Sequence, residues 1–133
     1  MKSSEPMYRG LLKVARANLT AATRDLQETD EVWVNFALFN VTQAVEKLIK
    51  CLCAINGIEH DYTHYLQGFA DKLIEKDVYI PEMVQDSLND YGKWSTQSRY
   101  SASQLVQRRF VEKHIECVDE WMTGVEERIA GSV

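Results

Sequence analysis

Two arginines and one histidine near the C-terminal end of the chain have side chains suited to acid–base chemistry. They are Arg108, Arg109 and His114 in the stretch RRFVEKH. A histidine can transfer a proton near neutral pH, and an arginine can stabilise negative charge that develops on a phosphate. Such a pair needs no metal ion, so the first candidate site is a metal-independent one.

That chemistry requires the side chains to converge, and the surrounding residues have a helical pattern. At about 100° per residue, His114 falls near the centre of the apolar face of this helix. On the same wheel Arg109 points about 140° away from His114, and Arg108 about 120° away. They would meet only through a kink or across a dimer. The alternative interpretation of His114 is a neutral core histidine with one buried hydrogen bond.

The remaining histidines and cysteines do not predict a metal site. His60 and His64 are four residues apart, but they straddle the expected start of a helix and have no third ligand nearby. His64 can instead hydrogen-bond a loop carbonyl. Cys51 and Cys53 point in different directions on one helix, and an odd total of three cysteines suggests reduced thiols in a cytoplasm.

The segment 31–56 is expected to form a long helix with two distinct faces. One face should belong to the core and contains Ala37, Val41, Ala44, Val45, Leu48, Leu52 and Ile55. The opposite face is aromatic at its start and charged at its end, and it contains Val32, Phe36, Phe39, Gln43, Glu46, Lys47 and Lys50. The two phenylalanines favour burial against another helix or a partner subunit. A self-complementary patch on a bundle predicts a two-fold dimer.

The charged half of that second face has two interpretations. It can be a solvated stripe with a Glu46–Lys50 ion pair at i,i+4 spacing. It can also continue an interface or form the rim of a cleft, where Lys47 and Lys50 attract an anion. In this second interpretation Arg99 also binds a phosphate or pairs with a buried Glu46, and Tyr100 stacks on a base. Otherwise Arg99 and Tyr100 anchor the preceding linker onto the bundle.

Helices must position these candidate residues, because no stretch of the chain alternates with a period of two. We expect long helices over about residues 6–27, 31–56 and 102–129, and shorter ones over about 63–74 and 81–94. Asn56-Gly57 should end the second helix, since glycine is the usual residue just past a helix. Ile74 and Phe110 are among the apolar positions expected to face inward. The pattern predicts an all-α antiparallel four-helix bundle, as a single domain over residues 1–133.

Composition limits the classes of function. The 133 residues are 45% hydrophobic, which is enough to build a core, and they carry a net charge of −5 with a pI near 5.2. An acidic balance argues against a dedicated nucleic-acid-coating protein but leaves room for a local basic site. The longest unbroken apolar run is residues 51–55, so we expect neither a secretion signal nor a membrane span and predict a cytoplasmic location.

The segment Ala37–Lys50, ALFNVTQAVEKLIK, resembles the signature helix of HEPN domains (higher eukaryotes and prokaryotes nucleotide-binding). An Ala-x-Phe-x-x-x-Gln-Ala-x-Glu-Lys-x-x-Lys pattern is typical of that family. Thr63-His64 with Leu66 resembles the family's opening of the next helix, and Arg99-Tyr100 resembles the pair that precedes the last helix. The resemblance covers nearly the whole chain, to about Val125.

The resemblance implies a helical bundle, a homodimer and a protein partner of the minimal nucleotidyltransferase class. Some branches of the family are RNA-cleaving toxins that carry an Arg followed four to six residues later by His. Arg108 and Arg109 meet this spacing to His114. However, Phe110 follows Arg109 where the family prefers a polar residue, and Glu116 stands where the family can carry a Tyr.

We therefore expect a dimeric, non-catalytic module that binds a nucleotide or RNA and works with a nucleotidyltransferase in a toxin–antitoxin-like system. Its expected binding residues are Lys47, Lys50, Arg99 and Tyr100, with no metal and no cofactor. The alternative is a metal-independent endoribonuclease toxin that uses Arg109 and His114 as its catalytic pair.

Overall fold

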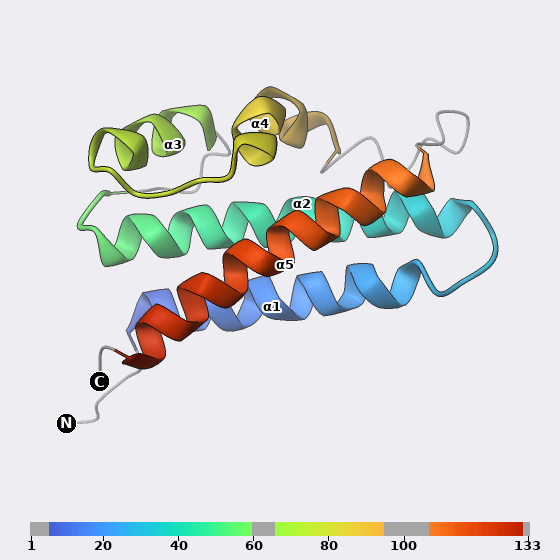
Figure 1. The fold of residues 1–133 in the computed structure, drawn as a ribbon, viewed down its shortest axis with the longest axis horizontal. Helices are drawn as coiled ribbons and strands as arrows, with labels where there is room; N and C mark the ends of the chain where they lie inside the picture. Colours follow the sequence, from blue (N-terminus) through green and yellow to red (C-terminus); the bar gives the residue numbers. More distant parts are fainter. Residues whose placement is uncertain (1–5, 60–65, 95–106, 132–133) are drawn as a thin grey trace.

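The computed structural model describes residues 6–59, 66–94 and 107–131, and these contain helices and no strand. The helices are α1 (Met7–Asp25), α2 (Val32–Ile55), α3 (Leu66–Glu75), α4 (Glu82–Trp94) and α5 (Arg108–Gly131). Figure 1 shows α1 and α2 antiparallel, α5 running across both, and α3 and α4 on the side of α2 away from α1. The predicted all-α fold, with three long helices and two short ones, is confirmed.

The central helix is α2, because it contacts each of the other four. Its expected core positions are buried: Ala37, Val41, Ala44, Val45, Leu48 and Leu52. Leu38 and Ile49, which lie outside that expected face, are also buried. A helix with neighbours on several sides buries more than one face, so α2 contributes the largest share of the bundle's interior.

Three positions that we expected to face inward are instead exposed. Ile55 is 42% exposed, Ile74 is 40% exposed and Phe110 is 41% exposed. Each lies in the first or last turn of its helix, where fewer neighbouring elements cover the side chain. The expected start of the last helix near residue 102 lies outside the described residues, and the described helix α5 begins at Arg108. Gln107 is not helical, and its carbonyl accepts the first bond of α5 from the N–H of Phe110 at 3.1 Å.

Two helices end with a left-handed residue. At the end of α2 the N–H of Ile58 bonds back across the last turn at 2.9 Å, and Gly57 has a φ of +69°. This Schellman ending favours glycine because a side chain is strained at positive φ, and it confirms the predicted helix end. At the end of α3 the N–H of Val78 bonds back at 3.0 Å, but here the left-handed residue is Asp77, with a φ of +60°.

Polar contacts fix α5 against α1. Arg16 of α1 binds both carboxylate oxygens of Glu126, at 2.6 and 3.0 Å, and one oxygen of Asp119 at 2.6 Å. The flat guanidinium suits this two-pronged contact, which sets the position of α5 along α1. Asn40 of α2 donates to Asp25 of α1 at 2.9 Å, and this bond ties the two helices near their connecting turn.

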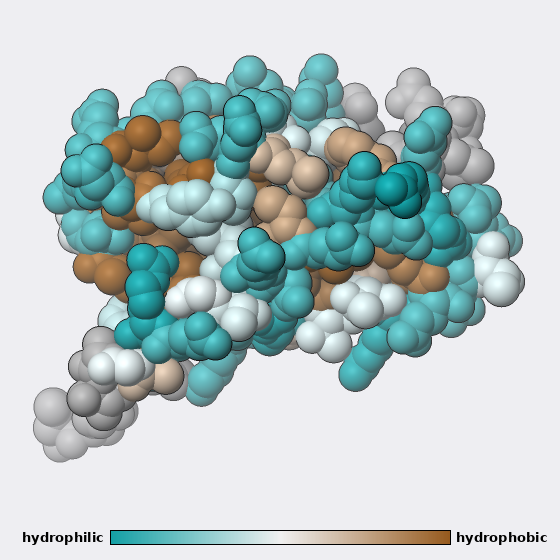
Figure 2. Space-filling view, in the orientation of Figure 1, coloured by the Kyte–Doolittle hydropathy of each residue, from teal (hydrophilic) through white to brown (hydrophobic). Residues whose placement is uncertain are grey.

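No helix within the described ranges combines the length and apolarity of a membrane span. In Figure 2 hydrophilic side chains cover most of the visible face. Hydrophobic surface gathers at the left of this view, where α3 and the C-terminal end of α2 lie.

Candidate functional site

His114 is fully buried and hydrogen-bonded to a tyrosine of a neighbouring helix. Its exposed fraction is 0%, and its Nε2 lies 2.6 Å from the hydroxyl of Tyr91 on α4, which is 1% exposed. The rings of Trp94 and Phe110 lie against the imidazole, with centroids 5.8 and 5.5 Å away. This environment matches the interpretation of His114 as a core histidine with one buried hydrogen bond.

Burial keeps both members of this pair uncharged. It lowers the pKa of His114 from 6.5 to about 4 and raises the pKa of Tyr91 far above its usual range. Ser87, one turn earlier on α4, lowers the pKa of Tyr91, but burial is the larger effect. The Nδ1 of His114 has no partner within the described part of the chain. Because a buried N–H without an acceptor is costly, we assign the ring proton to Nε2, which then donates to Tyr91.

The two arginines before His114 do not join it. The guanidinium of Arg108 donates to the backbone carbonyls of Leu26 at 2.7 Å and Glu28 at 3.2 Å, and it pairs with Glu31 at 3.3 Å. Arg108 therefore holds the turn between α1 and α2. Arg109 is exposed. Within one chain, the exposed Arg109 and the fully buried His114 do not share a solvent-accessible site.

The polar residues of α2 form two side-chain pairs at i,i+4 spacing. The ammonium of Lys50 lies 3.3 Å from a carboxylate oxygen of Glu46, and that of Lys47 donates to the amide oxygen of Gln43 at 3.1 Å. Glu46 is only 3% exposed, and the side chain of Lys50 is 12% exposed. The Glu46–Lys50 ion pair belongs to the solvated-stripe interpretation, but the burial of Glu46 belongs to the alternative one. This burial follows from the central position of α2, which leaves little of this helix in solvent.

Lys47 and Lys50 therefore differ as anion-binding groups. The charge of Lys50 is opposed by the buried carboxylate of Glu46, whereas the partner of Lys47 is a neutral amide. Among the described residues of this stripe, the half-buried Lys47 supplies positive charge that no carboxylate neutralises. Several other candidates lie outside the described residues, namely Arg99, Tyr100, His60 and His64.

The aromatic half of the same helix includes a residue that sequence reasoning missed. Phe36 is 36% exposed and Trp33 is 37% exposed, and their ring centroids are 5.4 Å apart. Val32 and Phe39 are half-buried. Trp33 was not on the expected second face, although its spacing of three from Phe36 was the signal that could have identified it.

The three cysteines are free thiols. Burial raises the pKa of Cys51 and of Cys53 to about 11, and the Cys51 thiol donates to the carbonyl of Tyr8 at 3.3 Å. These two thiols are protonated at neutral pH and are therefore poor nucleophiles and poor metal ligands. Across residues 6–59, 66–94 and 107–131, no three His, Cys, Asp or Glu side chains gather as a metal site would require.

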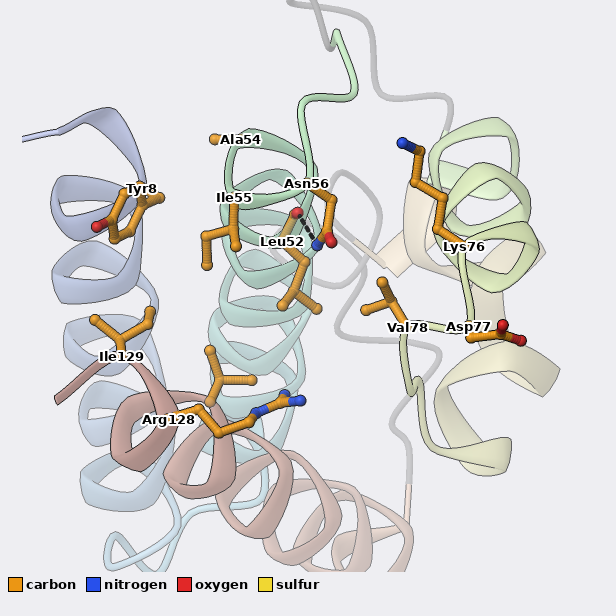
Figure 3. Close-up of a pocket in the computed structure, with 11 residues that line it drawn as sticks. Tyr8, Leu52, Ala54, Ile55, Asn56, Lys76, Asp77, Val78, Arg128 and Ile129 are labelled. Carbon is orange, nitrogen blue, oxygen red and sulfur yellow. Dashed lines mark hydrogen bonds between the residues drawn. The ribbon is translucent and has the colours of Figure 1, made fainter. Parts of the chain in front are cut away.

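A pocket of about 530 Å³ lies at the end of α5 opposite to His114. Figure 3 shows that the start of α1, the end of α2, the α3–α4 connection and the end of α5 surround it. Its wall contains Leu52, Ile55, Val78, Val125 and Ile129, and charged residues stand beside them, including Lys76 and Arg128. No sequence motif links these residues, because they come from separate segments of the chain.

Comparisons with known proteins add to this geometry. A family model described as "HEPN domain" matches residues 8–128. The chain is also similar to a solved crystal structure, that of the protein TT1696 from Thermus thermophilus. The two share 25% sequence identity with a TM-score of 0.69, and the alignment covers 92% of this chain and 98% of that chain. A comparison with curated proteins gave no significant match.

Proposed function

The chain belongs to the HEPN domain family, and from that premise we propose that it is a dimeric, non-catalytic module that binds a nucleotide or RNA in the cytoplasm. In this proposal it works with a nucleotidyltransferase partner in a toxin–antitoxin-like system. The supporting observation is the state of His114, which is fully buried and bonded to Tyr91 at 2.6 Å. A general base must reach the proton that it abstracts, and this imidazole does not reach solvent.

The charge on α2 supports the binding part of the proposal. Lys47 is half-buried, and its described partner is the neutral Gln43, so its charge is available to an anion in an otherwise acidic protein. A phosphate needs a positive charge that is not already neutralised, and Lys50 is held by Glu46. We therefore place the phosphate contact at Lys47, with Arg99 and Tyr100 as proposed further contacts.

Replacing Lys47 with glutamine should weaken binding of a mixed RNA pool about tenfold at low salt, since one charge-assisted contact is lost. Lys72→Gln is the matched control, because Lys72 is an exposed lysine on α3. Fluorescence anisotropy with labelled RNA measures both affinities. We avoid reversing the charge of Lys50, because that change would place a second carboxylate beside the buried Glu46. Equal losses of RNA affinity in Lys47→Gln and Lys72→Gln would refute the assignment of Lys47 as a phosphate contact.

A cleavage assay with the same RNA pool distinguishes the non-catalytic module from the ribonuclease alternative. We expect no cleavage products from the wild type in the absence of metal, and no difference between the wild type and Arg109→Gln. Arg109 is exposed, so this substitution should leave the fold intact and report on chemistry alone. Metal-independent cleavage that disappears in Arg109→Gln and in His114→Gln would establish the ribonuclease alternative.

Association should depend on the aromatic patch formed by Trp33 and Phe36. Exposed aromatic rings on one helix face are typical of an interface between subunits. By light scattering at high micromolar concentration, the wild type should have twice the chain mass of 15.3 kDa. The double variant Trp33→Asp with Phe36→Asp should be monomeric.

Val14→Asp provides the control for association, because Val14 is an exposed apolar residue on α1, with 47% exposure. This variant should remain a dimer. A wild type that stays at the mass of one chain would contradict the dimer, and dimers of equal strength in all three proteins would place the interface elsewhere.

A further inference from the structure

We propose that the pocket between α1, α2, the α3–α4 connection and α5 binds a small amphipathic anion. The ligand class is a hydrocarbon or aromatic body that carries one acidic group, such as a carboxylate. Neither Lys47 nor His114 lines this pocket. The site goes beyond the proposed function and does not depend on it.

The apolar wall of the pocket continues the bundle core to the surface. Leu52 and Val125 are 3% and 1% exposed, and both belong to the core cluster. Ile55 lies one turn beyond Leu52 on the core face of α2, yet it is 42% exposed and lines the same pocket. An apolar ligand group in this pocket would cover the Ile55 side chain and remove it from water, which is favourable. Figure 2 shows hydrophobic surface at this end of the molecule.

Two cations stand beside this apolar wall. In Figure 3 the guanidinium of Arg128 reaches from α5 toward Val78, and Lys76 extends its ammonium on the side of Asn56. Neither cation is in an ion pair with a described residue. The acidic residue of the pocket, Asp77, directs its carboxylate away from Arg128 in the same view. Arg128, which no described carboxylate pairs with in a protein of net charge −5, favours an acidic group on its side of the pocket.

The turn after α3 contributes three consecutive residues to the pocket, Lys76, Asp77 and Val78. Asp77 has a φ of +60° and is the left-handed residue that ends α3, a conformation that aspartate adopts more readily than most residues with a side chain. Lys76 and Val78, on either side of it, both line the pocket. The left-handed turn at Asp77 therefore places Lys76 and Val78 in the wall of one pocket.

The balance of the lining selects the ligand class. Aliphatic side chains and the ring of Tyr8 form the apolar part of the wall, so the body of the ligand should be hydrocarbon or aromatic rather than a polar sugar. The guanidinium of Arg128 suits a single acidic group, and the amide of Asn56 already donates to the carbonyl of Leu52 at 2.8 Å. A volume of about 530 Å³ is in the range of small-molecule pockets.

The probe for this site is 8-anilinonaphthalene-1-sulfonate, whose aromatic body carries one sulfonate and whose fluorescence rises in apolar surroundings. We expect the native protein to bind the probe at temperatures well below its unfolding transition. Octanoate should displace the probe, and 1-octanol, which has the same chain length without the charge, should do so at least about tenfold more weakly.

Matched variants locate the binding. Arg128→Gln should weaken probe binding about tenfold, whereas Arg24→Gln, at an exposed arginine of α1, should not. Ile55→Asp should abolish binding because it places a carboxylate in the wall. Ile74→Asp should have no effect, since Ile74 is 40% exposed, close to the 42% of Ile55, and does not line the pocket. Circular dichroism checks that each variant is folded.

Unchanged probe binding in a folded Ile55→Asp variant would overturn the proposed site. Equal displacement by octanoate and octanol would overturn the proposed anion. Lys47→Gln should leave probe binding unchanged, so the fate of this proposal is distinguishable from that of the RNA-binding proposal.

Discussion

Replacing Leu48 with alanine should lower the free energy of unfolding by about 2–5 kcal/mol. Leu48 has an exposed fraction of 0% and lies in the middle of α2, which contacts every other helix. Truncation removes apolar contacts and leaves a cavity in a packed core that cannot readily close. The size of the loss therefore depends on the central position of α2 as well as on the buried side chain.

Ile74→Ala is the control for this prediction, because Ile74 has a similar size but is 40% exposed. Its loss should stay below about 1 kcal/mol, since much of its side chain is already in water. Urea denaturation followed by circular dichroism measures both variants. A loss below about 1 kcal/mol for Leu48→Ala would mean that the wrong face of α2 has been placed in the core.

Stability should also fall by about 3 kcal/mol as the pH is lowered from 6.5 to 4, because of His114 alone. Burial lowers the pKa of this imidazole from 6.5 to about 4 in the folded protein. Between these values the unfolded chain binds a proton that the folded chain does not, so protonation favours unfolding. Above pH 6.5 His114 is unprotonated in both the folded and the unfolded chain, and below pH 4 it is protonated in both. The effect of His114 on the pH dependence of stability is therefore confined to the range between these two pKa values.

The variant His114→Gln isolates this contribution, since its amide can still hydrogen-bond Tyr91 but does not titrate. Other groups change stability over the same range. Burial raises the pKa of Asp25, for example, and that shift favours the folded state as the pH falls. Such effects are common to both proteins and cancel in the difference between their stability curves. Parallel curves for the wild type and His114→Gln would contradict the buried, neutral histidine.

The helical periodicity was sufficient to predict the fold and most of the core. The apolar positions of α2 recur at spacings of three and four, and those from Ala37 to Leu52 are buried as predicted. The same method failed at Ile55, Ile74 and Phe110. A helical wheel describes a helix as if its partners covered its full length, and these residues lie where the coverage ends. It also placed Glu46 on an outer face, since it carries no information about a second layer of helices.

The candidate site was less predictable because its contacts join distant parts of the chain. The position of His114 on the core face was enough to predict one buried hydrogen bond. It was not enough to identify Tyr91 as the partner. Arg108 met the spacing of a catalytic pair, yet its guanidinium holds the α1–α2 turn. The role of Arg108 depends on how α5 lies against the α1–α2 turn, and no local sequence pattern predicts that arrangement. The pocket beside Ile55 likewise exists only after four segments have packed together.

An NMR titration of the His114 ring tests most directly the central claim, that this histidine is a neutral core residue and not a catalytic base. Its resonances are assigned by their absence from the spectrum of His114→Gln. We predict that the ring stays uncharged down to about pH 4, with its proton on Nε2. A titration midpoint near 6.5 would contradict the claim and would return Arg109 and His114 to the role of a ribonuclease pair.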